Sequence, residues 1–242
     1  MSKASPGSRG SSKNKPPKEP KLSRTHAPAE LSAVEWQRAL RRQFGREQAF
    51  GLENIGAEPV FSEFRVSNPE SKRAYRVAIR GRLPGDNYCA CPDYATNELG
   101  TCKHIEFVLA QLEGKRGAKT AFARGYQPPF SELYLRNDGG RRIHFRAGTD
   151  CPPSVRETAE SLFDETRGGV LRVEDFAALE RFMAATAKSG HELRAYDDAL
   201  DFIAGRKDAE QRAARLDKLL RSGRDAFPLK KLLNVPLYPY QA

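Results

Sequence analysis

Three of the four cysteines in this 242-residue chain lie close together, beside a histidine. They form the pattern Cys89-x-Cys91, ten intervening residues, then Cys102-x-His104. Zinc favours thiolate and imidazole ligands, and three cysteines with one histidine complete a tetrahedral structural site. Residues i and i+2 of an extended segment point to the same side, so one cysteine pair can face a single ion. The spacing predicts one structural zinc ion bound by these four residues.

Other interpretations of the cluster stay open. The thiols and the histidine could be buried core residues without a metal. A catalytic zinc would keep one coordination position for water, so one of the four residues would not bind it, and no carboxylate stands out as a general base. Four cysteines are too few for a disulfide scaffold, and a reducing cytosol keeps thiols free. Cys151, just before two prolines, is predicted to be a spare thiol.

The elements around the cluster must position its ligands. Residues 60–66 and 74–80 are rich in β-branched and aromatic side chains, and a turn signal separates them, which predicts a hairpin. Apolar residues at i, i+3, i+4 and i+7 from Ile105 predict a helix over 103–113. A capping-box pattern at Ser32 predicts an earlier helix that ends near residue 48. The ten residues between the ligand pairs are expected to form a loop.

The second half of the chain is predicted to form one hairpin followed by helices. A linker is predicted at Pro128-Pro129, and a strong turn at 137–140 separates strands at 133–136 and 142–146. Helical periodicity predicts four helices, at 155–164, 173–189, 193–204 and 209–220. The expected fold class is α+β. A small zinc-bound β-hairpin and helix finger domain precedes a hairpin and a mainly helical region, after a disordered basic N-terminal tail.

The zinc-ligand segment resembles a known family. Tyr88-Cys-Ala-Cys-Pro-Asp-Tyr94, then Cys102-Lys-His-Ile105 and an apolar helix, is similar to the SWIM-type zinc finger. The resemblance covers roughly residues 60–113, under a quarter of the chain, and no motif position departs from the pattern. Such fingers occur in bacterial Swi/Snf-type ATPases, in transposase-derived proteins and in some ubiquitin-pathway and recombination proteins. The resemblance implies binding to DNA or to protein rather than catalysis.

The last residues resemble the start of a motor domain. Leu237-Tyr-Pro-Tyr-Gln241 is similar to the Leu-x-x-Tyr-Gln opening of the Swi/Snf-type helicase core, where the glutamine helps to recognise adenine. By that resemblance Gln241 is the cofactor-binding residue; a proline-capped tail that packs two tyrosines is the alternative. The chain has no G-x-x-x-x-G-K-[ST] phosphate loop, so it is expected not to hydrolyse ATP and not to be an enzyme.

These patterns divide the chain into four predicted parts. They are a disordered basic tail (1–28), a SWIM zinc finger domain (29–127), a mixed hairpin and helical accessory region (128–235) and a truncated helicase-core start (236–242).

Positive charge concentrates at the N-terminus and around the finger. The net charge is +10, of which residues 1–25 contribute +6, and a tail of this kind can neutralise phosphates. Cations around the finger, with Tyr88 and Tyr94 as stacking platforms, are predicted to bind nucleic acid; a solvated face is the alternative. The predicted nucleic-acid-binding residues are Arg80, Arg82, Lys103, Lys115, Arg116, Lys119 and Arg124.

The chain is expected to be cytoplasmic and to bind a macromolecule. No apolar run approaches the ~18 residues of a membrane span, and no secretory signal is visible. We expect a zinc-binding SWIM-type module that binds nucleic acid, DNA foremost, or a protein, without a small-molecule substrate. Its expected place is the N-terminal accessory region of a Swi/Snf-type DNA-dependent ATPase. A freestanding protein–protein adaptor with a structural zinc finger is the alternative.

Overall fold

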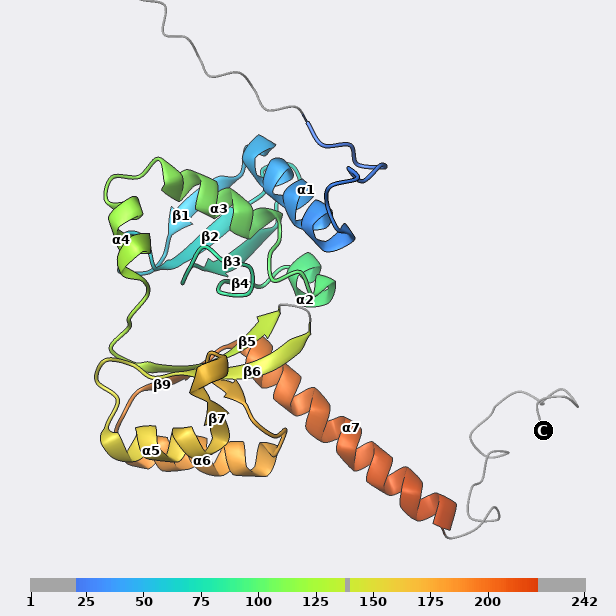
Figure 1. Cartoon of the computed structure of the whole chain (residues 1–242), viewed down its shortest axis with the longest axis vertical. Coiled ribbons are helices and arrows are strands. Elements are labelled where there is room, and N and C mark those ends of the chain that lie inside the picture. Colours follow the sequence, from blue (N-terminus) through green and yellow to red (C-terminus); the bar gives the residue numbers. More distant parts are fainter. Residues whose placement is uncertain (1–20, 138–139, 222–242) are drawn as a thin grey trace, which may run out of the picture.

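The described part of the chain contains helices and two β-sheets. The computed structural model describes residues 21–137 and 140–221. We call residues 33–124 the N-terminal lobe and residues 131–221 the C-terminal lobe. In Figure 1 the two sheets lie between helices: α1 and α3 cover the outer side of one sheet, and α5 and α6 cover the outer side of the other. The prediction of a mixed helix and sheet protein is confirmed at this level.

The N-terminal lobe is built on an antiparallel sheet in the order β1-β2-β3-β4. The predicted hairpin is β2–β3, and β1 and β4 extend it on either side. The lobe's elements are α1 (Ala33–Glu47), β1 (Gly51–Asn54), β2 (Glu63–Ser67), β3 (Ala74–Ala78), β4 (Tyr88–Cys89), α2 (Pro92–Asn97), α3 (Lys103–Glu113) and α4 (Ala118–Arg124). The elements β1, α2 and α4 were not predicted, because they are short and lack a full period of apolar residues.

Helix α3 packs between the sheet and α1. Its apolar stripe, which includes Ile105, Val108 and Leu112, is buried in the core of this lobe, as the periodicity predicted. The helix α1 packs against α3, and the two backbones approach each other closely at Gly45. A Cβ atom on Gly45 of α1 would lie 2.7 Å from the carbonyl oxygen of Lys103, so glycine permits this contact. The predicted capping box of Ser32 and its N3 residue starts α1.

The C-terminal lobe contains a five-stranded sheet in the order β7-β8-β6-β5-β9. The strand β9 runs parallel to β5, whereas the other pairs are antiparallel. The lobe's elements are β5 (Ser131–Asn137), β6 (Arg141–Arg146), α5 (Pro153–Leu162), β7 (Phe163–Asp164), the 3-10 helix η1 (Glu165–Arg167), β8 (Val170–Leu171), α6 (Phe176–Lys188), β9 (Leu193–Ala195) and α7 (Asp197–Arg221). The helix α7 starts beside β5 and β6 and runs away from both sheets (Figure 1).

Two of the helices predicted after the second hairpin differ from the observed elements. Residues 193–195, predicted as the start of a helix, form β9, because Leu193 pairs with Ser131 of a strand some sixty positions earlier. The two helices predicted at 193–204 and 209–220 are one helix, α7. No proline interrupts the chain between them, and Gly205 is tolerated within the helix.

The predicted disordered tail (1–28) lies only partly within the described residues. Residues 1–20 lie outside them, as do the predicted helicase-core start (236–242) and Gln241. Residues that follow position 20 contact α1 directly: Lys21 forms an ion pair with Glu47 at 2.7 Å, and the Trp36 indole donates to the Ser23 carbonyl at 3.0 Å. This part of the predicted tail therefore packs along a helix.

A buried carboxylate connects the two lobes. Glu132 on β5 has no exposed side-chain surface and accepts hydrogen bonds from Arg80 at 3.2 Å and Arg146 at 2.8 Å. The hydroxyl groups of Tyr126 and Tyr196 also donate to it, at 3.1 and 2.5 Å. A buried carboxylate is tolerated only when its charge and lone pairs are satisfied, and these four groups satisfy it.

Replacing Glu132 with glutamine should destabilise the protein strongly. The substitution keeps the shape of the side chain but leaves the buried Arg80 guanidinium without its counter-charge, so we expect a loss of about 3 kcal/mol in unfolding free energy. Urea denaturation followed by circular dichroism measures it. The matched control is Glu192→Gln, which breaks an exposed pair with Arg194 and should cost less than about 1 kcal/mol. Equal losses in the two variants would contradict the role given to Glu132.

Candidate metal centre

The four predicted ligands come together in the N-terminal lobe. One ligand atom from each of Cys89, Cys91, Cys102 and His104 lies within 4.8 Å of all the others, and all four residues are buried. The His104 Nδ1 atom lies 3.8 Å from the Cys89 sulfur and 4.0 Å from the Cys102 sulfur. The imidazole therefore faces the thiols with Nδ1. The predicted grouping of these residues is confirmed.

The donor set and its spacing fit one metal ion. With ordinary zinc–sulfur and zinc–nitrogen bond lengths, neighbouring ligand atoms of a tetrahedral site lie about 3.6–3.8 Å apart. The distances from His104 Nδ1 are at or slightly above this range, so small side-chain movements would bring the ligands onto a common ion. Three thiols and an imidazole select zinc and similar thiophilic ions over magnesium or calcium, which require oxygen ligands.

The electrostatics of the cluster also favour a cation. Burial raises the pKa of the Cys89 and Cys102 thiols, because each would place a negative charge away from water. The pKa of Cys91 is lowered, mainly because its sulfur accepts a hydrogen bond from the Cys102 thiol and, to a smaller extent, one from the Cys89 thiol. The Tyr94 backbone amide is a further donor to Cys91, at 3.4 Å. Three adjacent thiolates repel one another, and a bound divalent ion would balance their charge as it displaces their protons.

Two helix starts and a strand end position the ligands. Cys89 ends β4, Cys91 is the N-cap of α2, and Cys102 is the N-cap of α3. His104 follows in the first turn of α3, and its ring lies 4.9 Å from that of Tyr75 and 5.3 Å from that of Phe50. The ten-residue segment between the ligand pairs, expected to be a loop, contains α2. Its proline at the first helical position favours this start.

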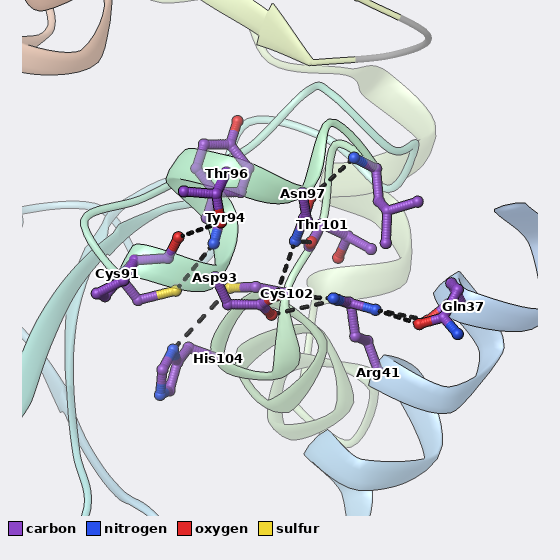
Figure 2. A network of polar contacts seen from close by, with 12 residues as sticks. Gln37, Arg41, Cys91, Asp93, Tyr94, Thr96, Asn97, Thr101, Cys102 and His104 are labelled. Atoms are coloured by element: carbon purple, nitrogen blue, oxygen red, sulfur yellow. Dashed lines mark hydrogen bonds and ion pairs between the residues drawn. The ribbon is translucent and has the colours of Figure 1, made fainter. Parts of the chain in front are cut away.

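A polar network holds the segment between the two ligand pairs (Figure 2). Arg41 of α1 donates to both carboxylate oxygens of Asp93, at 2.7 and 3.2 Å, and also to Gln37. The Asn97 side chain donates to Asp93 and to the Thr101 carbonyl just before the second ligand pair. No local sequence pattern links Arg41 to Asp93 and Asn97, because only the folded chain brings α1 next to α2.

The same segment also touches the C-terminal lobe. Gly100 has a φ of +71°, and a Cβ atom there would lie 2.1 Å from the Asn137 carbonyl oxygen. Both the backbone angle and the lack of space require glycine at this position. The metal-ligand segment is therefore packed between α1 on one side and the end of β5 on the other.

The predicted nucleic-acid-binding residues do not all share one surface. Arg80 is 5% exposed and pairs with Glu132, so its assignment to a phosphate surface is wrong. Tyr88 and Tyr94, predicted stacking platforms, are also buried, at 6% and 1% exposure. Lys103 is half-buried beside the Phe44 ring of α1. The remaining residues are exposed: Arg82, Lys115, Arg116, Lys119 and Arg124.

Comparisons of the chain with protein-family models, with curated proteins and with solved structures found no match. The resemblance to the SWIM finger therefore rests on the motif residues themselves. Among the helices that the structure describes, none has the length and apolar character needed to cross a membrane.

Cys102→Ser should remove the metal and destabilise the chain, whereas Cys151→Ser should keep the metal. Cys151 is also a buried free cysteine, but it lies in the core of the C-terminal lobe, so it is a matched control. We expect one metal ion per wild-type chain by mass spectrometry, and a melting temperature lower by about 10 °C or more in Cys102→Ser, because metal-binding energy contributes to folding. Equal metal contents and melting curves for both variants would refute the site.

Proposed function

We propose that this chain is a SWIM-type module with one structural zinc ion that binds nucleic acid, DNA foremost. Three cysteines and one histidine complete a four-coordinate site, which is typical of zinc that stabilises a fold. The burial of all four ligands supports this role over a catalytic one, since a catalytic ion needs an open position. Zinc would then stabilise the surfaces built on β4, α2 and α3.

The nucleic-acid proposal rests on a group of exposed cations on and beside α4. Residues 114–125 contain four cations and no acid. Arg82 joins them, because its guanidinium lies 4.6 Å from the ring centre of Phe122 in α4. We call this set the basic surface: Arg82, Lys115, Arg116, Lys119 and Arg124. Uncompensated exposed cations of this kind attract phosphate groups.

The cations of α1 behave differently. Arg41, Arg42 and Arg46 form ion pairs with Asp93, Glu106 and Glu113, respectively. Within the described part of the chain, no carboxylate lies within ion-pair distance of any member of the basic surface. The positive charge of the basic surface is therefore available for a ligand, whereas the charges of these three arginines of α1 are paired.

The wider context that the resemblance supports is the N-terminal accessory region of a Swi/Snf-type ATPase. In that arrangement the module would position a cytoplasmic motor on DNA and would not itself hydrolyse ATP. Reading the coding sequence downstream of Ala242 tests it: a phosphate loop within ~30 residues supports a motor, and a stop codon supports the freestanding protein–protein adaptor.

Charge reversal on the basic surface should weaken DNA binding and reduce its dependence on salt. For the double variant Lys119→Glu and Arg124→Glu, we expect about a tenfold or greater loss of affinity. The slope of log affinity against log salt concentration should become less steep by about 2, because two phosphate contacts are lost. Fluorescence anisotropy with labelled duplex and single-stranded DNA at several salt concentrations measures both quantities.

The control variant places the same charge change on α7. Arg212→Glu with Arg215→Glu alters two exposed cations of that helix and should change affinity much less. Equal effects of the two double variants would show that net charge alone attracts DNA. No binding of the wild-type chain to DNA or RNA at low salt would exclude the nucleic-acid function.

A further inference from the structure

A cleft between the two lobes has features of a binding site. It has a volume of about 280 Å³ and lies next to the metal centre, since Cys89 is among its lining residues. The N-terminal lobe contributes residues of β4 and α2, and the C-terminal lobe contributes residues of β5, β6 and α7. The members of the basic surface do not line it.

Two buried polar atoms at this cleft lack hydrogen-bond partners. Asn137 is 1% exposed, and its Oδ1 atom is unpaired, as is the buried Nε atom of Arg141. These residues face each other directly across β5 and β6, so their side chains lie on the same face of the sheet. The Asn137 side-chain nitrogen donates to the Tyr94 carbonyl at 3.5 Å, and an Arg141 Nη2 atom donates to the Ala95 carbonyl. These contacts hold both side chains while one acceptor and one donor remain unused.

The wall formed by α7 adds two carboxylates. Asp198, Asp201 and Phe202 follow the i, i+3, i+4 spacing that places side chains on one helix face. Burial raises the pKa of Asp198 to about 6, as expected for a carboxylate partly removed from water. In the portion of the chain that the structure describes, neither Asp198 nor Asp201 forms an ion pair, whereas the neighbouring Asp197 pairs with Arg76 at 2.8 Å.

We propose that this cleft binds an arginine side chain presented by a partner protein. The cleft offers three acceptors, namely the carboxylates of Asp198 and Asp201 and the amide oxygen of Asn137. A guanidinium group has five N–H donors in a plane, so it can serve several acceptors at once. The peptide carbonyl of the same arginine can accept from the unused Arg141 Nε atom. Phe202 offers an apolar surface to the methylene chain or an aromatic face to the guanidinium.

Other ligand classes match the cleft less completely. A nucleotide could pair with Asn137 and Arg141 through its base, but its phosphate would bring negative charge towards Asp198 and Asp201. A lysine side chain supplies three donors on a compact ammonium group and lacks the planar fork. The inference goes beyond the nucleic-acid function, because it concerns a different surface and a ligand of opposite charge.

Titration of the full-length chain, labelled with nitrogen-15, tests the proposal by nuclear magnetic resonance. The probe is N-acetyl-arginine N-methylamide, and its neutral isostere N-acetyl-citrulline N-methylamide is the matched ligand. We expect saturable shifts of amide signals at Asn137, Arg141 and 198–202 with the arginine compound, and about tenfold weaker binding of the citrulline compound, since it lacks the charge.

Asp201→Asn should weaken binding of the arginine compound about tenfold, because one charged hydrogen bond is lost. Asp201 is exposed, so the variant should keep the wild-type melting curve. Asp208→Asn makes the same charge change at another exposed position of α7 and should leave affinity unchanged. The variant Lys119→Glu with Arg124→Glu should also bind the arginine compound normally, which separates this site from the basic surface.

Several outcomes would overturn the proposal. They are equal binding of the arginine and citrulline compounds, no saturable shift up to tens of millimolar, or equal losses in Asp201→Asn and Asp208→Asn. Saturation of the same amide signals by cytidine or adenosine, without saturation by the arginine compound, would assign the cleft to a nucleobase instead.

Discussion

The arrangement of the two lobes depends on the hydrogen bonds and ion pairs of the buried Glu132 carboxylate. The carboxylate is buried on a central strand and accepts hydrogen bonds from Arg80 of the N-terminal lobe and from Arg146 and Tyr196 of the C-terminal lobe. An ionised group in the interior must keep all its partners, because losing one leaves a charge without compensation. The lobes therefore cannot slide across each other without breaking this set. The position of β5 relative to the segment of the candidate metal ligands follows from it.

The metal centre depends on this arrangement as well as on its own ligands. The segment between the ligand pairs packs on α1 through Arg41 and Asp93, and it meets β5 where Gly100 contacts Asn137. A zinc ion would close the short segment from β4 to α3, which has few apolar residues to stabilise it otherwise. The cleft beside Cys89 lies where this segment faces the C-terminal lobe. A metal that orders the segment would thus also shape one wall of the cleft.

The two proposed binding surfaces differ in the sign of their charge. The basic surface on α4 has exposed cations without carboxylate partners, which suits phosphate groups. The cleft between the lobes carries Asp198 and Asp201 together with an unpaired amide oxygen, which suits a cation. A module with both surfaces could contact DNA and a protein at the same time. The nucleic-acid module and the protein adaptor would then be compatible functions of one chain.

The sequence by itself determined the features that depend on local pattern. The Cys-x-Cys and Cys-x-His pairs identified the candidate metal ligands, and apolar periodicity located α3. Strand-forming residues on either side of turn signals located the hairpins β2–β3 and β5–β6. Tertiary structure alone decided which groups meet across long separations. Arg80 looked like a surface cation, yet it is buried against Glu132, 52 positions later in the chain. Likewise β9 is a strand because β5 offers an edge, and the cleft exists because α7 passes the segment that holds the candidate metal ligands. Local patterns report the preferences of neighbouring residues, whereas burial and charge pairing depend on the packing of distant ones.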